Sequence, residues 1–272
     1  MRLSTISTQI QLARRPNGQP VPDDFLTVEV PLPALADGEV RVRNEYVSVD
    51  PYMRGRMDDR PSYVEPFKLH ETMTGAAVGR VTDSASSTFA PGDLVLHRYG
   101  WRDIAQGAAA EFTRVADLPD LPSSVHLGVM GATGMTAYVG LLVVARMRED
   151  EVVFVSAAAG AVGSLAGQIA RLKGAAHVIG SAGSDEKVAV MLERYGYDAA
   201  FNYRRAPVLE QLAAAAPAGI DVYFDNVGGD HLEAALSAFN YGGRRSAAPF
   251  RSTTASACRP GRGSWKTSST GA

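Results

Sequence analysis

The sequence has a single cysteine, no long hydrophobic run and almost no excess of charge. Because Cys258 is the only cysteine among 272 residues, an internal disulfide framework and a multi-thiolate zinc site are excluded. The net charge of −2 gives no indication of nucleic-acid or membrane binding. No apolar run approaches the roughly 20 residues of a membrane span, and Met1-Arg-Leu-Ser does not begin a signal peptide. We expect a cytoplasmic protein.

The character of the sequence changes near residue 123. Residues 1–122 contain short alternating or apolar segments interrupted by Pro and Gly, which is typical of a β-rich unit with substantial loops. The strand-like segments are 25–30, 39–49, 74–81, 93–98 and 109–115, and the second of them is expected to run into a Pro-Tyr-Met loop. From Ser123 onward, strand-like and helix-like segments alternate, and this order predicts a parallel sheet. The predicted fold class is therefore α/β, with a β-rich N-terminal domain over 1–122 and a second domain over 123–244.

The second domain is organised around a glycine loop that follows a buried strand. The apolar run Val152 to Val155 has the length and β-branching of a parallel strand, and an amphipathic helix follows from Ser164 to Lys173. Between them lies Ala-Ala-Gly-Ala-Val-Gly, which ends at Gly163. It matches the glycine-rich fingerprint of dinucleotide-binding loops, except that Ala158 stands where the first glycine is usual. Strand, glycine loop and helix in this order indicate a dinucleotide-binding loop, with the pyrophosphate at the helix N-terminus.

The next strand predicts which nicotinamide cofactor binds. An NAD site would have an acidic residue at the end of this strand to accept from the ribose 2′-hydroxyl. Here small residues occupy 180–184, no acid occurs before Asp185, and Lys187 supplies a cation one helical turn along. Small residues and a nearby cation suit a 2′-phosphate, so NADP(H) is predicted over NAD(H). Tyr203 is a candidate to stack on adenine or to bond this phosphate.

Several motifs occur in an order that resembles one known family. They lie at 41–57 (which includes Asp50-Pro-Tyr-Met), 131–141, 157–163, 183–187, 201–203 and 224–229. Together they resemble the zinc-independent medium-chain dehydrogenases/reductases of the leukotriene B4 12-hydroxydehydrogenase/prostaglandin reductase type, which include curcumin reductase-like double-bond reductases. The resemblance covers roughly residues 5 to 244. It implies a GroES-like N-terminal domain, a Rossmann domain, and NADPH-dependent reduction of the C=C bond of α,β-unsaturated ketones or aldehydes.

The resemblance also assigns residues to the site. The residues expected to contact NADP(H) are Met135, Thr136, Gly160, Ala161, Val162, Gly163, Lys187, Tyr203 and Asn226. Tyr52 is expected to face the substrate, where charge develops on the carbonyl oxygen as hydride reaches the β-carbon. No metal is expected: His70-Glu71 is suggestive, but the segment 47–50, where zinc-dependent relatives carry cysteine, has no thiol.

Residues 245–272 depart from that family. They contain no Leu, Ile, Val, Met, Asp or Glu, so we expect a disordered, non-native tail. Codons permitted for 245–255 can be read two bases later as Leu-Gly-Gly-Ala-Val-Ser-Gln-Tyr-Asn-Gly, the family motif whose tyrosine stabilises the enolate. We therefore hypothesise a frameshift near Arg244 that truncates the chain. The Rossmann domain is then incomplete, the strand 221–225 lacks a pairing partner, and stability and turnover are reduced.

Three functions stay open at this stage. The first is an enone or 2-alkenal reductase, which the motifs at 50–53 and 201–203 favour. The second is an NADPH quinone oxidoreductase, which would share the cofactor site. The third is a catalytically inactive NADP-binding remnant, which the missing tyrosine motif supports. Each predicts a small-molecule partner. A homodimer is implied by the resemblance, and the truncation argues against it. A short-chain dehydrogenase is disfavoured because Tyr-x-x-x-Lys does not occur.

Overall fold

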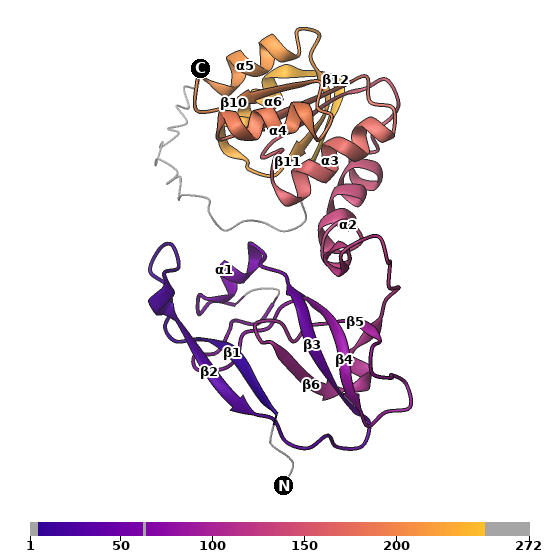
Figure 1. Cartoon of the computed structure of the whole chain (residues 1–272). Helices are drawn as coiled ribbons and strands as arrows, with labels where there is room; N and C mark the ends of the chain where they lie inside the picture. The colour runs from indigo at the N-terminus through magenta and orange to yellow at the C-terminus, as the bar shows by residue number, and fades with distance from the viewer. Residues whose placement is uncertain (1–4, 62–63, 248–272) are drawn as a thin grey trace, which may run out of the picture.

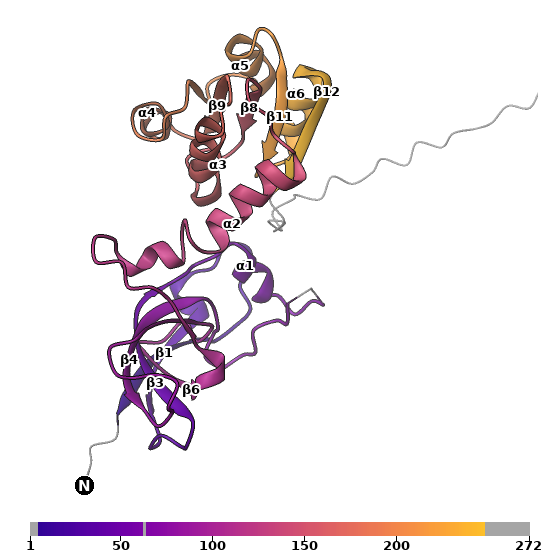
Figure 2. The same cartoon turned by 90° about the vertical axis from the view of Figure 1, so that its right-hand side faces the viewer.

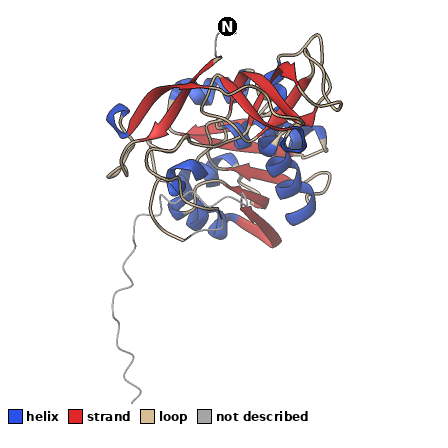
Figure 3. Ribbon diagram, turned by 90° about the horizontal axis from the view of Figure 1, so that it is seen from below, coloured by secondary structure: helices blue, strands red, loops and turns tan. Residues whose placement is uncertain are grey.

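The computed structural model describes residues 5–61 and 64–247. An antiparallel β-rich part is formed by the N-terminal residues, and a helix-flanked parallel sheet by the later ones, with helix α2 (Ala132–Tyr138) between them (Figure 1). Figure 3 distinguishes the strands (red) from the helices (blue) when the molecule is seen from below. Within the described ranges, no helix combines the length and the apolarity required to cross a bilayer. The predicted α/β class is confirmed.

The N-terminal part is built from antiparallel strands. Its strands are β1 (Ile6–Leu12), β2 (Phe25–Pro31), β3 (Glu39–Val47), β4 (Ala77–Ser84), β5 (Leu94–His97), β6 (Ile104–Ala108) and β7 (Thr113–Arg114). β1 pairs with β2, and the others form a sheet in the order β6-β3-β4-β5-β7. Alternate residues of β3, Val40 and Val42, are fully buried. That alternation is typical of a sheet with one face on a core.

Two features of this part differ from the sequence prediction. β1 and β6 were not predicted, because their polar residues weaken the alternating hydrophobic pattern. The segment after Pro51 was predicted to be a loop, but it forms the short helix α1 (Tyr52–Arg56). Met53 on this helix and Met57 directly after it are buried in a small cluster that also contains Phe67. Burial of these side chains fixes α1, although its sequence reads as a turn.

The second part is a parallel sheet. Its strands are β8 (Val152–Val155), β9 (His177–Ala182), β10 (Ala199–Asn202), β11 (Ile220–Asp225) and β12 (Phe239–Ala247). Their order is β10-β9-β8-β11-β12, and every pair is parallel. This is the order of the Rossmann fold through its fifth strand, and it reverses direction between β8 and β11. The predicted Rossmann domain is therefore confirmed through this strand.

Helices cover both faces of the parallel sheet (Figure 2). They are α3 (Ala161–Leu172), α4 (Asp185–Glu193), α5 (Val208–Ala215) and α6 (Gly229–Ala238), with a π-helical continuation of α2 at Val139–Val144. Along β8, Val153 and Val155 pack against α2 and α3, whereas Phe154 packs toward α5 and α6. Burial on both faces explains why this strand reads as a continuous apolar run. The short 3-10 turns lie at Pro22–Asp24, Ala109–Glu111 and Ser123–His126.

The fifth strand corrects one prediction. The strand 221–225 was expected to lack a pairing partner on one side, but β12 pairs with β11 from Ile220↔Phe239 to Asp225↔Ala247. β12 therefore includes 245–247, three residues that were assigned to the non-native tail. The pairing register shifts near Gly242, which has φ of 83°. This irregularity breaks the alternating pattern by which a strand is predicted from sequence. The rest of the predicted tail, 248–272, lies outside the described residues.

Candidate cofactor and substrate sites

The loop after β8 brings backbone groups to the N-terminus of α3. Gly160 is the residue that precedes the helix, so the free N–H groups of the first helical turn lie just beyond it. Gly163 lies in that turn, and a Cβ on it would be 2.4 Å from the carbonyl oxygen of Ala157. Only glycine therefore allows α3 to approach the loop this closely. The predicted residues Ala161, Val162 and Gly163 form the start of this helix, which suits an anion.

The side chain of Tyr197 holds α3 against the loop. Tyr197 is buried, and its hydroxyl donates a 2.7 Å hydrogen bond to the carbonyl oxygen of Gly163. A Cβ on Gly167 would lie 2.2 Å from the Tyr197 ring, so the ring fits only because position 167 has no side chain. Burial raises the pKa of the Tyr197 phenol, and the group therefore acts as a neutral donor. This contact positions the first turn of α3 relative to the sheet.

A cavity opens at the carboxyl ends of β8 and β9, and we call it the β9 cavity. Its volume is about 360 Å³. Its lining residues are Ala157, Ala159, Gly160, Ala182, Gly183, Ser184, Lys187, Tyr203, Arg204 and Val227. The structure thus brings together three predicted cofactor residues from separate elements: Gly160, Lys187 and Tyr203.

The β9 cavity carries positive charge. In the described part of the chain, neither the Lys187 ammonium nor the Arg204 guanidinium forms an ion pair with an acidic side chain. Ser184 adds a hydroxyl at the N-terminus of α4, where it accepts from the Lys187 backbone N–H at 3.4 Å. Two cations without an acidic partner in the described ranges, a hydroxyl and a helix N-terminus have the chemistry that suits a phosphate group.

Tyr203 forms one wall of this cavity. A Cβ on Gly183 would lie 2.9 Å from the Tyr203 hydroxyl oxygen, so the phenol lies over a residue without a side chain. The other side of the ring packs edge-on against the buried His231, with centroids 5.2 Å apart. The Arg204 guanidinium lies 5.8 Å from the centre of the same ring. The aromatic surface and the cationic group next to it suit an adenine ring and a neighbouring phosphate.

A hydrogen-bond network joins β8 to β11 where the sheet order reverses. The backbone N–H of Asn226 donates to Ser156 Oγ at 2.9 Å, and its side-chain amide donates to the Ser156 carbonyl at 2.8 Å. The Tyr223 hydroxyl bridges Ser156 Oγ and Asp225 Oδ1, at 3.1 and 2.9 Å. Ligands of such sheets bind at this reversal, where the network holds Asn226, and the contact of Asn226 with a cofactor stays a prediction. Asn226 does not line the β9 cavity, whereas its neighbour Val227 does.

Asp225 is the charged centre of that network. Burial alone would raise the pKa of its carboxyl, but Arg245, the N–H groups of Gly228 and Val227, and the Tyr223 hydroxyl outweigh burial and lower it. Gly228 and Val227 donate to Oδ1 at 2.6 and 3.0 Å. Because the carboxylate stays ionised and fully bonded, it fixes the turn that carries Asn226.

Met135 and Thr136 lie in the middle of α2. Thr136 is buried, while the Met135 side chain is 63% exposed. Neither residue is among the described residues that line the β9 cavity or the second cavity below. Their contact with a nicotinamide therefore stays a prediction that the location of α2 between the two parts allows (Figure 1).

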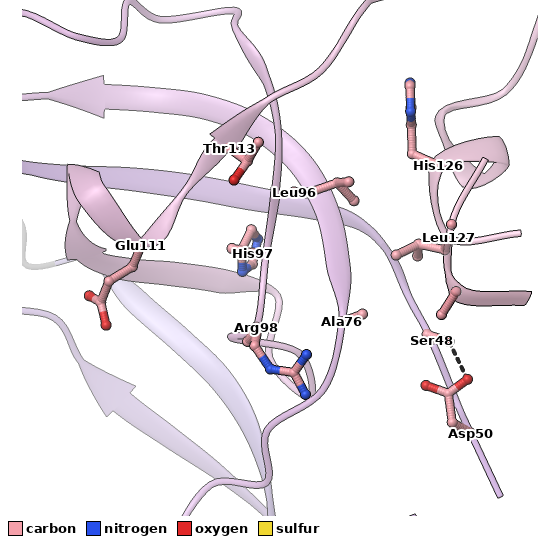
Figure 4. Close-up of a pocket in the computed structure, with 12 residues that line it drawn as sticks. Ser48, Asp50, Ala76, Leu96, His97, Arg98, Glu111, Thr113, His126 and Leu127 are labelled. Carbon is pink, nitrogen blue, oxygen red and sulfur yellow. Dashed lines mark hydrogen bonds between the residues drawn. The ribbon is translucent and has the colours of Figure 1, made fainter. Parts of the chain in front are cut away.

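The second cavity, which we call the α2 cavity, lies between the β-rich part and the N-terminus of α2. Its volume is about 400 Å³. Figure 4 shows its lining, which consists of Ser48, Asp50, Ala76, Leu96, His97, Arg98, Glu111, Thr113, His126, Leu127, Gly131 and Ala132. Ser48 donates to Asp50 Oδ1 at 2.9 Å, as the dashed line in Figure 4 marks.

The predicted substrate residue Tyr52 lies close to the α2 cavity in sequence but not in its lining. It is the first residue of α1, two residues after Asp50, and its phenol interacts with the guanidinium of Arg56. Burial lowers the pKa of Arg56, and Tyr52 opposes that change. Arg56 is fixed in turn by the Glu65 carbonyl and the Thr74 hydroxyl, at 2.8 and 3.1 Å.

No metal centre is found in the described ranges, 5–61 and 64–247: no group of three or more His, Cys, Asp or Glu side chains is placed to hold an ion. His70 has φ of 60° and its side chain is exposed, and Glu71 pairs with Lys68 at 3.5 Å. The two residues that were suggestive in the sequence therefore do not form a ligand set.

Sequence reasoning missed some residues of the site. Arg204 lines the β9 cavity and directly follows the Phe-Asn-Tyr motif, so its position was the available signal. Ser156, which holds Asn226, gave no signal, because a serine at the end of a buried strand has many roles. The α2 cavity was not predicted, since its lining comes from segments far apart in the chain.

Comparisons with known proteins agree with this architecture. A family model described as the N-terminal domain of oxidoreductase matches residues 8–115, and one described as zinc-binding dehydrogenase matches 161–252. The NADPH-dependent curcumin reductase of Escherichia coli is 42% identical over 233 residues, which are 86% of this chain and 67% of that protein. Prostaglandin reductase 1 of Bos taurus is 46% identical over 231 residues, 84% of this chain and 67% of that protein.

A solved structure shows the same fold. CurA from Vibrio vulnificus in complex with NADPH superposes with a TM-score of 0.81 and 42% identity, covering 88% of this chain and 70% of that one. The matching family models and relatives place the chain in the class of nicotinamide-dependent oxidoreductases. Within that class, the chain belongs to the medium-chain dehydrogenase/reductase family, in the branch of the curcumin and prostaglandin reductases. The name of the second family model mentions zinc, for which the described residues provide no ligand set.

Proposed function

We propose that this protein is an NADPH-dependent reductase of the C=C bond in α,β-unsaturated ketones and aldehydes. The observation that carries the proposal is the β9 cavity, where Lys187 and Arg204 have no acidic partner in the described ranges. A 2′-phosphate would satisfy both cations, whereas an unphosphorylated ribose would leave both without a counter-charge. The identity with reductases of curcumin, which is a conjugated enone, supports the same substrate class.

The described residues offer groups suited to each part of NADPH. The first turn of α3 and Gly160 would hold the pyrophosphate, because the free N–H groups of that turn begin at Gly160, which lines the β9 cavity. Lys187, Arg204 and Ser184 would hold the 2′-phosphate, and Tyr203 would cover the adenine. The network of Ser156 would present the Asn226 side chain at the reversal of the sheet, on the path to the nicotinamide. When bound, NADPH supplies the hydride for the reaction.

The chain's own contribution to the chemistry is to hold the enone and to stabilise charge on its carbonyl oxygen. We assign the second role to Tyr52, because its phenol is a hydrogen-bond donor next to the cationic Arg56. The α2 cavity would admit a small substrate between the β-rich part and α2, with Ala76, Leu96 and Leu127 as apolar lining. Met135 and Thr136 on α2 would then lie on the nicotinamide side.

Product analysis tests this function. The full chain is incubated with methyl vinyl ketone and NADPH that carries deuterium in the hydride position. We expect butanone with deuterium on the former β-carbon and an intact carbonyl group. Formation of the allylic alcohol, or turnover of a quinone with no turnover of the enone, would contradict the proposal. Tyr52→Phe is expected to lower kcat by about tenfold to a hundredfold and to leave NADPH binding unchanged.

Two further expectations concern the cellular location and the oligomeric state. A cytoplasmic location suits a chain with one cysteine, because a reducing compartment does not require disulfides. Among the described residues β12 is the last strand of the sheet, where a second copy could extend it, so a homodimer stays a proposal that size-exclusion chromatography with light scattering would test.

A further inference from the structure

Asp185 is the first acidic residue after β9 and lies next to the proposed 2′-phosphate site. It begins α4 directly after Ser184, and Ser184 and Lys187 both line the β9 cavity, whereas Asp185 does not. A carboxylate in this loop is the group that an NAD site uses to accept from the ribose 2′-hydroxyl. The question is therefore what keeps this carboxylate from the nucleotide.

The Asp185 carboxylate is bound by two side chains, one from the last residue of β10 and one from the loop after it. The Asn202 side-chain amide donates to Asp185 Oδ1 at 2.7 Å. The Arg205 guanidinium forms an ion pair with Oδ2 through Nη2, and its Nε approaches Oδ1 at 3.4 Å. Hydrogen bonds from Arg205 and then Asn202 lower the pKa of the Asp185 carboxyl, which is therefore ionised at neutral pH.

Two successive arginines in this loop, Arg204 and Arg205, have different partners. Arg204 lines the β9 cavity and has no acidic partner in the described ranges, while its neighbour Arg205 points to Asp185 and does not line the cavity. Asn202 connects the two, because its side-chain oxygen accepts from the Arg204 backbone N–H at 3.1 Å. The first turn of α4 carries two acids, Asp185 and Glu186. Arg205 neutralises Asp185, so the carboxylate directly after Ser184 does not cancel the positive charge of the cavity.

We propose that Arg205 is a positioning residue for cofactor selectivity, which holds the Asp185 carboxylate away from the nucleotide ribose and so favours NADPH over NADH. This inference rests on the proposed function, in which the β9 cavity holds a 2′-phosphate. Without Arg205, the negative charge of Asp185 would repel that phosphate. The freed carboxylate would also be available to accept from the 2′-hydroxyl of NADH.

Equilibrium titration of the full-length protein with NADPH and NADH, followed by cofactor fluorescence, tests the inference. For Arg205→Ala we expect the NADPH to NADH affinity ratio to fall about threefold to tenfold, because one uncompensated charge lies near the phosphate. Arg205→Lys, which keeps the charge, should retain most of the ratio. The double variant Asp185→Asn with Arg205→Ala should restore it, because the acid is then removed. The change should shrink at about 0.5 M salt, where charges at this distance are screened.

Arg194→Ala is the matched control. Arg194 lies at the other end of α4, is exposed, and forms no ion pair with the described residues, so its removal changes net charge equally without freeing Asp185. An Arg205→Ala variant with the wild-type ratio, or a double variant that stays as low as the single one, would overturn the inference and leave the proposed function intact. A wild-type protein that prefers neither cofactor would overturn both.

Discussion

Arg245 of β12 donates two hydrogen bonds to the same oxygen of Asp225 at the end of β11, from Nε at 3.0 Å and from Nη2 at 2.6 Å. The Asp225 side chain is only 3% exposed. The Arg245 guanidinium supplies the positive charge that neutralises this buried carboxylate. A residue that sequence reasoning assigned to a non-native tail therefore stabilises the turn that carries Asn226. The fifth strand is part of the proposed site as well as part of the sheet.

Removal of Arg245 is expected to destabilise the fold. Arg245→Ala removes the cation next to a buried carboxylate, but the Arg245 side chain is 44% exposed and Asp225 keeps its bonds from Tyr223, Val227 and Gly228, so we expect a loss of about 1–3 kcal/mol in the free energy of unfolding. Chemical denaturation followed by far-UV circular dichroism measures the effect. Arg204→Ala, which removes an arginine with no acidic partner in the described ranges, should change the free energy of unfolding by less than about 0.5 kcal/mol. Equal loss in both variants would show that the Asp225 contact is not what matters.

The glycine loop offers a second test. Gly163→Ala would place a Cβ 2.4 Å from the Ala157 carbonyl oxygen, a backbone atom that cannot move cheaply. We expect α3 to shift outward, with a loss of stability of about 1–3 kcal/mol and weaker NADPH binding. At Gly128 the nearest atom to a new Cβ is 3.6 Å away, so Gly128→Ala is the control for the substitution itself. Thermal melts and NADPH titrations of both variants should separate them, and matching results would refute the packing argument.

The core of the second domain was predictable from sequence because each signal there has one physical cause. Val152–Val155 is apolar since both faces of β8 are covered, and Gly163 is glycine since the helix packs on the loop. Other features were not predictable. α1 is fixed by the burial of Met53, and β12 contains a glycine with positive φ and charged residues whose partners come from distant strands. The local sequence pattern carries no information on pairing between residues that are far apart in the chain.

The two cations of the β9 cavity are expected to act on NADPH alone. Lys187→Ala and Arg204→Ala should each weaken NADPH binding about tenfold, because each removes a charge-assisted hydrogen bond to the phosphate. NADH binding should stay within about twofold. Lys173→Ala, at the C-terminal end of α3, controls for the general loss of a lysine. Equal weakening of NADPH and NADH would contradict the phosphate assignment.

His97 is expected to make the fold sensitive to acid. Burial lowers the pKa of its imidazole to about 4, with a smaller contribution from Arg102, and its ring is 5% exposed. Because the unfolded chain has the higher pKa of about 6.5, it binds the proton first as the pH falls, so stability drops between about pH 6.5 and 4. From pH 7.5 to 5 this histidine should contribute a loss of roughly 2 kcal/mol.

His97→Gln removes that titration. Its free energy of unfolding should fall less steeply between about pH 7.5 and 5 than that of the wild type, as measured by urea denaturation at each pH. Some dependence should stay, because burial also lowers the pKa of His231. Identical slopes in the two proteins would show that His97 is not buried as a neutral group.

The most direct measurement is the affinity of the purified full-length protein for NADPH and NADH, with 2′,5′-ADP and 5′-AMP as fragments that differ only in the 2′-phosphate. If the β9 cavity holds that phosphate through Lys187 and Arg204, NADPH should bind at least about tenfold more tightly than NADH, and 2′,5′-ADP more tightly than 5′-AMP. Equal affinities within each pair, in protein with a cooperative unfolding transition, would contradict the cofactor assignment and with it the proposed reductase function.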